Sequence, residues 1–184
     1  KIIAIVNTSS TNLGVFKDNF FDATICFGPL YHLPRPDDQE KTVKELWRTL
    51  KVGGILFISA ISYYGVIGTV VKSYPEEFKM KNHEPMFLYG IHLSKWHGDD
   101  ISVFPDAKFW KPLELKKFME KRGFETIEMA ACEGIFTHLR EYVNEISKDK
   151  AIWNKIVRIA IESSNDPTLL GNTEHFLWIG KKIG

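Results

Sequence analysis

Two apolar runs decide the fold: Phe20-Phe21-Asp22-Ala23-Thr24-Ile25-Cys26-Phe27 and Ile55-Leu56-Phe57-Ile58-Ser59. Both are short and rich in β-branched and aromatic side chains, which predicts two buried strands, and the first is apolar enough to be covered on both faces. Between them lies a helical stripe made by Val43, Leu46, Trp47 and Leu50. A strand, a helix and a strand over this length predict a right-handed crossover between parallel strands.

The rest of the chain continues this alternation. One helix is expected from Asp37 to the glycines at 53 and 54, and another from Pro112 to Gly123. Further strands are expected at residues 2–6, 124–131 and 174–181, with two amphipathic helices around 139–146 and 152–159. This order places the chain in the α/β class.

The composition is that of an ordinary globular domain. The 184 residues suffice for one domain, and 44% hydrophobic and 26% charged residues are average values. With 24 Lys+Arg and 23 Asp+Glu, the formal net charge of +1 gives no electrostatic support for nucleic acid or membrane as partner. No apolar run approaches the ~20 residues that span a bilayer, and no secretory leader is recognised. We therefore expect a cytoplasmic protein, whose oligomeric state is unknown.

Cysteines and histidines do not predict a metal site. Cys26 and Cys132 lie far apart and form no CxxC pair, and we expect Cys26 to be a buried core thiol. His83, His92 and His97 have a spacing that matches no compact site, so no metal is expected.

Four stretches resemble the class I S-adenosylmethionine-dependent methyltransferases. They are the strand segment from Asp18 to Cys26, the segment Gly28-Pro29-Leu30-Tyr31-His32-Leu33, the segment Glu45-Leu46-Trp47-Arg48-Thr49-Leu50-Lys51-Val52-Gly53-Gly54-Ile55-Leu56, and the closing segment from Leu170 to Leu177. Val52 stands where the family usually has proline. The form of the second segment is similar to a subgroup that acts on small molecules.

The resemblance implies a Rossmann-like sheet that is mostly parallel, with an antiparallel last strand near its edge. In the family, a glycine-rich turn (G-x-G-x-G) and an acidic residue after the second strand hold the cofactor. This chain has no such turn, so the N-terminal strands and helices are missing and residues 1–184 are expected to be one incomplete domain. An N-terminal part that is not ordered, one that was removed, or a gene for a short non-catalytic relative would each account for this. The apolar edge left on the strand at 20–27 favours the first two.

The resemblance also implies a cofactor and site residues. The cofactor would be S-adenosylmethionine, its methionine part lined by Phe27, Gly28 and Leu30 at the carboxyl end of a strand, and Ser9 and Ser10 match the loop that meets the adenine. Tyr31 and His32 are the catalytic candidates, because a histidine beside the methyl group can act as general base. A Gly-Pro turn, a plain polar loop and a capping histidine are the structural alternatives for these residues.

Residues 61–111 carry many aromatic side chains without a clear period. We interpret them as a cap or insert that is too short for a core of its own. The candidates there for an acceptor pocket are Tyr63, Tyr64, His83, Tyr89 and His92, although aromatic residues are more often core. Elsewhere, we expect Asp22 to bond backbone amides, and Arg48 and Lys51 to lie on a solvated helix face.

Three functions remain open. The first is methyl transfer from S-adenosylmethionine to a small-molecule acceptor. The second is a dinucleotide-dependent oxidoreductase, which would normally show a Tyr-x-x-x-Lys pair, whereas Tyr64 is followed four residues later by Gly68. The third is a non-catalytic interaction domain derived from the methyltransferase fold.

Overall fold

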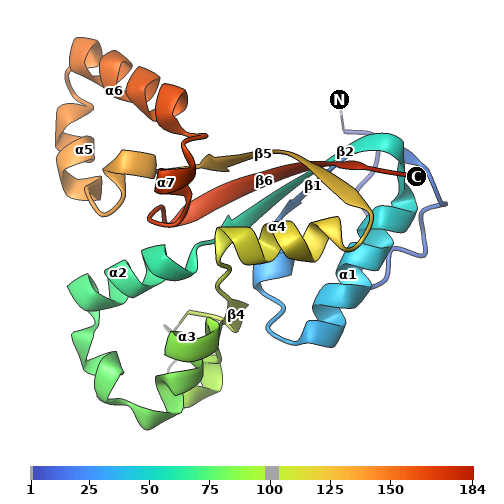
Figure 1. Cartoon of the computed structure of the whole chain (residues 1–184), viewed down its shortest axis with the longest axis horizontal. Coiled ribbons are helices and arrows are strands. Elements are labelled where there is room, and N and C mark those ends of the chain that lie inside the picture. The colour runs from blue at the N-terminus through green and yellow to red at the C-terminus, as the bar shows by residue number, and fades with distance from the viewer. Residues whose placement is uncertain (1, 98–103) are drawn as a thin grey trace.

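The computed structural model describes residues 2–97 and 104–184 (Figure 1). Within them, the main sheet consists of β1 (Phe21–Phe27), β2 (Leu50–Ile61), β6 (His175–Lys182) and β5 (Phe124–Ala131), in that order across the sheet. β1 and β2 are parallel, and β6 is antiparallel to both of its neighbours. The α/β class and the mostly parallel sheet with an antiparallel last strand are therefore confirmed, although β6 lies between β2 and β5 and not at the edge.

Helices connect the strands of the main sheet. They are α1 (Pro36–Thr49), α2 (Tyr63–Ser73), α3 (Glu84–Tyr89), α4 (Pro112–Glu120), α5 (Arg140–Ile146), α6 (Lys150–Ser163) and α7 (Pro167–Leu170), and a small second sheet pairs β3 (Ile91–His92) with β4 (Ala107–Lys108). Short 3₁₀ turns lie at Pro29–Tyr31, Pro75–Lys79, Lys81–His83, Ser94–His97 and Gly134–Phe136. No helix in the described ranges is long and apolar enough to cross a membrane.

One predicted helix end and one predicted strand differ from the structure. α1 ends at Thr49 because Leu50 already has extended dihedral angles, so the two glycines at 53 and 54 lie inside β2. The strand expected at residues 2–6 is wrong for this structure, which gives those residues no regular structure. Ile2, Ile3 and Ile5 are 79%, 95% and 90% exposed, and an extended segment with no paired neighbour gains no ladder hydrogen bonds.

The core lies on one face of the sheet. Leu56, Ile58, Phe176 and Trp178 are fully buried there, in one cluster with the inward residues of α1 and α4. On the opposite face, Ile25 and Phe27 of β1 are 67% and 56% exposed. The prediction that the strand at 20–27 is covered on both faces is wrong for this chain, which covers one face of the sheet.

Two polar residues near β1 form specific hydrogen bonds and ion pairs that the sequence did not predict. Arg48 is not simply solvated: its guanidinium donates to the carbonyl oxygens of Leu13 and Phe16 and pairs with Glu45, which fixes the loop before β1 against α1. Asp22 pairs with the Lys51 ammonium at 2.6 Å and not with backbone amides of a turn. That hydrogen bond lowers the pKa of Asp22, although an ion pair this exposed contributes little stability.

The buried position of Cys26 is confirmed. Its side chain is 3% exposed within the main core cluster. Burial raises the pKa of the Cys26 thiol to about 11, so it is protonated and unreactive near neutral pH.

Residues 61–111 leave the sheet after β2 and return to it beside their starting point. The Trp110 amide donates to the Ile61 carbonyl, and Ser62 forms a bridge with Trp110. This segment has a small apolar cluster of its own, made by Ile61, Val70, Met86, Ala107 and Phe109. Figure 1 shows it as a lobe at one end of the sheet, with α5 and α6 forming a second lobe at the same end.

Candidate functional site

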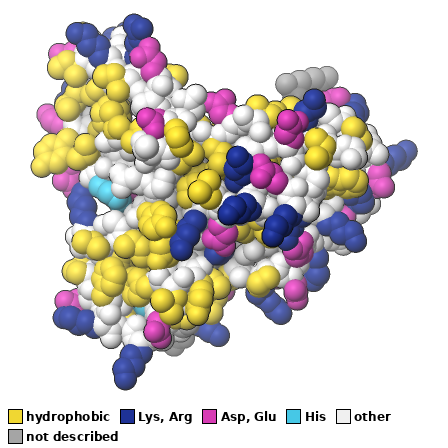
Figure 2. Space-filling model, in the orientation of Figure 1, with side chains coloured by type: hydrophobic (Ala, Val, Ile, Leu, Met, Phe, Trp, Pro, Cys, Tyr) yellow, Lys and Arg dark blue, Asp and Glu magenta, His cyan; other side chains and the backbone are white. Residues whose placement is uncertain are grey.

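The candidate site lies at the carboxyl ends of β1 and β2, where the two lobes project. β1 runs directly into Gly28, and the last residue of β2, Ile61, pairs with His175 at the start of β6. Because β5 is antiparallel to β6, the carboxyl end of β5 reaches the same edge. Ligands of open α/β sheets bind at this edge. Figure 2 shows hydrophobic side chains gathered over both lobes, and charged side chains over the part that contains α1 and α4.

The segment after β1 has a backbone that only glycine adopts easily. Gly28 has φ 124° and ψ −59°, a region where a side chain would be strained. Leu30 is 1% exposed and anchors the following 3₁₀ turn in the core, while Tyr31 packs against both apolar clusters. Phe27 stays exposed beside this turn. A ligand at this place therefore meets backbone and aromatic ring, and not the Leu30 side chain.

His32 lies between this turn and the lobe formed by residues 61–111. Its Nδ1 is 3.2 Å from the carbonyl oxygen of Asp106, and its ring centroid is 4.7 Å from that of Tyr31 and 5.9 Å from that of Phe104. Because a carbonyl oxygen only accepts, this contact selects the tautomer with hydrogen on Nδ1 and leaves a lone pair on Nε2.

The two serines lie on the loop before β1. The Ser9 hydroxyl is 2.8 Å from the hydroxyl of Thr11, and the exposed Ser9 forms a bridge with Asn12. The half-buried Ser10 is 3.2 Å from the hydroxyl of Thr42 on α1. These contacts explain how the loop is held, and both backbones remain near the surface.

A cavity of about 760 Å³ opens under residues 61–111, and we call it the cap cavity. This volume is typical of sites for small molecules. Its wall is mainly apolar, with Ile61, Val70, Met86, Phe104 and Phe109, and its polar groups are His92, Glu77, Thr69, Glu174 and His175. His92 is 4% exposed, and its Nε2 is 3.0 Å from the Phe104 carbonyl oxygen.

Of the five pocket residues expected from the sequence, His92 lines the cap cavity. The Tyr63 hydroxyl donates to the Phe87 carbonyl, and His83 is buried with its Nδ1 3.2 Å from Glu77. Tyr64 and Tyr89 are 51% and 64% exposed. His97 was considered for a metal and set aside, and its side chain lies outside the described part of the chain.

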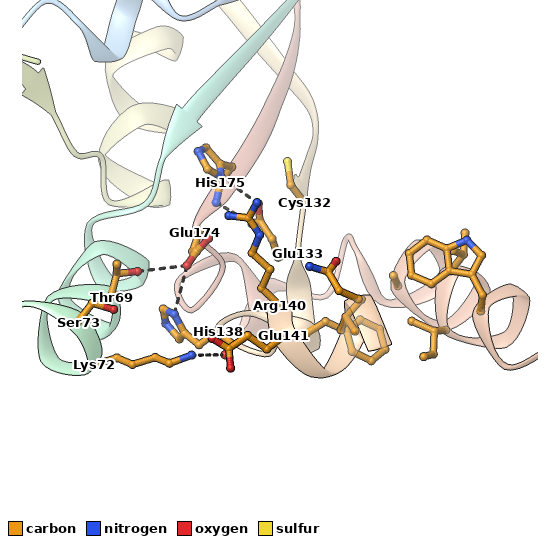
Figure 3. A pocket seen from close by; sticks show the side chains of 17 residues that line it. Thr69, Lys72, Ser73, Cys132, Glu133, His138, Arg140, Glu141, Glu174 and His175 are labelled. Atoms are coloured by element: carbon orange, nitrogen blue, oxygen red, sulfur yellow. Dashed lines mark hydrogen bonds and ion pairs between the residues drawn. The ribbon is translucent and has the colours of Figure 1, made fainter. Parts of the chain in front are cut away.

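A second cavity, of about 610 Å³, lies between α2 and the α5–α6 lobe, and we call it the helix cavity. Of the titratable side chains that line it, Glu133, His138, Glu174 and His175 form two close pairs, and the sequence did not single them out as site residues (Figure 3). His175 Nδ1 is 2.9 Å from Glu133 Oε1, and His138 Nδ1 is 3.3 Å from Glu174 Oε1. Thr69 donates its hydroxyl to Glu174 at 3.2 Å.

Strand pairing explains why this cluster is formed. The described ladder between β5 and β6 ends with Ala131 opposite Phe176, so the next residues of β5 meet the residues that precede Phe176. The one available signal was the pair of polar segments at those two strand ends, Cys132-Glu133 and Glu174-His175. Using it required knowing that the two strands are antiparallel neighbours.

Ligand atoms of Glu133, Glu174 and His175 lie within 4.8 Å of one another, a set that could hold a metal ion. However, both Glu133 oxygens already accept hydrogen bonds from His175 and Thr173. Glu133 is already paired with His175, and Glu174 with His138, so this arrangement does not require an ion.

Part of the chain matches a known protein family. Residues 1–58 match the methyltransferase domain family, a span that contains β1, the turn with Gly28 and His32, and α1. A search of curated protein sequences found no match.

The whole chain resembles solved methyltransferases in fold. One, a S-adenosylmethionine-dependent methyltransferase from Methanosarcina mazei, is 18% identical with a TM-score of 0.58, covering 96% of this chain and 65% of that chain. One from Archaeoglobus fulgidus is 16% identical (TM-score 0.52; 96% and 66% covered), and one from Clostridium acetobutylicum is 12% identical (TM-score 0.52; 97% and 64% covered). At these identities the likeness shows the fold, and the chain spans about two thirds of the length of these structures.

Residues 1–58 thus match the methyltransferase domain family, and the whole chain has the fold of S-adenosylmethionine-dependent methyltransferases, which implies S-adenosylmethionine as the cofactor. The residues present fit one part of that cofactor: the glycine turn after β1 offers open backbone and the exposed ring of Phe27. The chain has no glycine-rich turn for the nucleoside part.

Proposed function

We propose that the protein containing this chain transfers a methyl group from S-adenosylmethionine to a small molecule bound in the cap cavity. The proposal rests mainly on where the cap cavity lies. The cavity lies at the carboxyl end of β2, and the ring of its wall residue Phe104 is 5.9 Å from that of His32. His32 belongs to the segment that matches the methyltransferase domain family. Donor and acceptor would thus meet at one edge of the sheet, as an in-line transfer requires.

On the donor side, bound S-adenosylmethionine supplies a methyl group on a positively charged sulfur. Phe27, Gly28 and the backbone of Leu30 would line its methionine part, and the aromatic faces of Phe27 and Tyr31 suit the sulfonium charge. Ser9 and Ser10 would meet the adenine through their backbones. These roles for Ser9, Ser10, Phe27, Gly28, Leu30 and Tyr31 stay predictions.

The uncovered face of the sheet suggests how the donor site is completed. Parallel strands are normally covered on both faces, yet Ile25 and Phe27 are mostly exposed, and β1 has a free edge among the described strands. We infer that a part of the protein outside this chain pairs with β1, covers that face and supplies the glycine-rich turn. Residues 61–111 would then act as a cap over the acceptor.

On the acceptor side, the wall of the cap cavity favours a flat, largely apolar molecule. Apolar side chains form most of the wall, and a few polar groups at one end can orient the ligand. A small-molecule partner, rather than nucleic acid or membrane, also fits the net charge of +1. A cytoplasmic location stays a prediction.

Calorimetric titration of the full-length protein with S-adenosylhomocysteine tests the proposal directly. Saturable binding is the expected result, because the product retains the adenosyl and methionine parts of the donor. The control is a Gly28→Val variant, which strains the turn at φ 124° and should weaken binding. No detectable heat at millimolar ligand would refute the enzyme and favour a non-catalytic domain.

His32 gives a second prediction on the donor side. If His32 takes up the proton of the acceptor, His32→Ala lowers turnover and leaves the affinity for S-adenosylhomocysteine unchanged. His32→Asn is the matched variant, since its amide can still donate to the Asp106 carbonyl but offers nothing in place of Nε2. Equal losses of turnover in both variants would support His32 as the general base. Full activity in His32→Asn, or a parallel loss of stability, assigns His32 a structural role.

A further inference from the structure

The cluster at the start of β6 contains a histidine, His175, that is oriented by the side chains of Glu133 and Thr173. Glu133 Oε2 accepts hydrogen bonds from the Thr173 hydroxyl at 2.7 Å and from the His175 amide at 2.8 Å, which leaves Oε1 for His175 Nδ1. Thr173 is fully buried, and its own oxygen accepts from the amides of Glu133 and Gly134. The carboxylate therefore has one orientation, and so has the imidazole that donates to it.

This contact sets the charge state of both partners. Burial raises the pKa of Glu133, but the hydrogen bonds from His175 and Thr173 outweigh it and lower the pKa to about 2. The hydrogen bond to Glu133 raises the pKa of His175 above its usual 6.5, and burial opposes this only in part. When His175 is neutral, its hydrogen lies on Nδ1, and Nε2 carries the lone pair.

His175 lies where the two cavities meet. Thr69, Glu174 and His175 line both the cap cavity and the helix cavity, so a ligand in the cap cavity can reach the imidazole. Figure 3 shows the second ring nitrogen of His175 on the side of the ring away from Glu133. The titratable groups that line the two cavities together with His175 are Glu133, Glu174, His138, Cys132, Lys72, Arg140, Glu141, Tyr74, Glu77 and His92.

The acceptor atom that attacks the methyl carbon also gives its proton to the base, so the donor side and His175 must lie on either side of that one atom. Phe27 pairs with Ser59 of β2, and Ser59 pairs with Leu177 of β6, two residues after His175. Two strand spacings separate β1 from β6, about 10 Å. The apolar wall made by Ile61, Phe104 and Phe109 lies along this path and favours an aromatic molecule.

We propose that His175, positioned by Glu133 and Thr173, is the general base of methyl transfer, and that the acceptor is an aromatic molecule with a reactive O–H or N–H group. This rests on the function proposed above. The lone pair of the acceptor oxygen or nitrogen forms the bond to the methyl carbon as the carbon–sulfur bond breaks, and that electron pair stays on sulfur. The acceptor's proton moves to Nε2, and the resulting imidazolium is stabilised by the Glu133 carboxylate.

The first test is nuclear magnetic resonance of the full-length protein with ¹⁵N-labelled histidine, which needs no acceptor. His175 should show hydrogen on Nδ1 when neutral and a pKa above 6.5. Glu133→Gln should lower that pKa, whereas the matched control Glu174→Gln, which removes the partner of His138, should change it much less. A neutral His175 with hydrogen on Nε2 would overturn the proposal. A second result would also overturn it: Zn²⁺, added after chelator treatment, shifts the signals of His138 and His175 together. The cluster would then be a metal site.

The second test is turnover, followed as S-adenosylhomocysteine formed from S-adenosylmethionine with 4-substituted phenols and anilines as probes. His175→Gln should lower kcat about 100-fold, as expected for loss of a general base, with unchanged affinity for S-adenosylhomocysteine. Added imidazole should partly restore turnover in His175→Ala. Glu133→Gln should move the acidic limb of the pH–rate profile to lower pH, because base catalysis is lost as pH falls through the pKa of His175. A purely structural role for Glu133 would lower stability and leave that limb in place.

Three results would count against the proposal while leaving the proposed function intact. One is binding of S-adenosylhomocysteine without turnover of any phenol or aniline, which would exclude the acceptor class. Another is turnover of His175→Gln within twofold of the wild type. The third is an acidic limb that is lost in His32→Asn and unchanged in Glu133→Gln, which would make His32 the base. Absence of S-adenosylhomocysteine binding would instead refute the proposed function.

Discussion

Trp178→Ala is expected to lower the free energy of unfolding by about 3–5 kcal/mol, the usual cost of truncating a fully buried aromatic side chain. Trp178 is 0% exposed, its ring lies edge-on to Phe124 at 5.9 Å, and its Nε1 donates to the Thr126 hydroxyl at 3.1 Å. It lies on β6, between β2 and β5, so the cavity left behind loosens the packing of three strands. Urea unfolding followed by circular dichroism measures the loss.

Trp153→Ala is the matched control. It removes the same atoms from α6, a helix without a buried residue, where Trp153 is half-buried at the helix cavity. We expect a loss below about 1.5 kcal/mol, since less apolar area is re-exposed there. Equal losses at the two positions would contradict a core centred on the sheet face covered by α1 and α4.

The sequence predicted the part of the fold that local periodicity encodes. The helix stripe of Val43 and Leu46 and the apolar runs on either side sufficed for the crossover from β1 to β2. The position of β6 between β2 and β5 was not predictable in this way, because its single-strand pattern does not say which neighbours it pairs with. The isoleucines at 2, 3 and 5 show the opposite case: their pattern predicts a strand, but no partner among the described residues pairs with them.

The candidate site was likewise predictable only where its residues are close together in the sequence. The turn from Gly28 to His32 was readable, because it follows its strand directly and matches a known motif. Glu133 and His175 are 42 residues apart, and only the antiparallel pairing of β5 and β6 brings them together. Among the pocket residues predicted at 61–111, His92 lines the cap cavity, whereas Tyr64 and Tyr89 are largely exposed, because composition alone does not separate a cavity wall from the surface.

Gly65→Ala is expected to damage both stability and the candidate site, because α2 touches the loop before β6 at this glycine. A Cβ at position 65 would lie 2.3 Å from the carbonyl oxygen of Thr173 and 2.8 Å from the Cα of Glu174, both of them backbone atoms that cannot rotate away. Either the helix or the loop must shift, which costs about 1–3 kcal/mol, offset by about 1 kcal/mol from the better helix propensity of alanine. Urea unfolding measures the net loss.

The neighbouring Gly68→Ala variant separates steric contact from helix propensity. Its Cβ would lie 2.4 Å from Nε2 of His138, the far end of a side chain that can turn aside, so we expect little loss or a small gain in stability. A shift of the loop in Gly65→Ala displaces Thr173, and with it the hydroxyl that holds Glu133 against His175. The pKa of His175 should therefore fall in Gly65→Ala and stay unchanged in Gly68→Ala. If both variants were equally stable and the His175 titration were the same in both, the contact between α2 and the loop would not be what positions the Glu133–His175 pair.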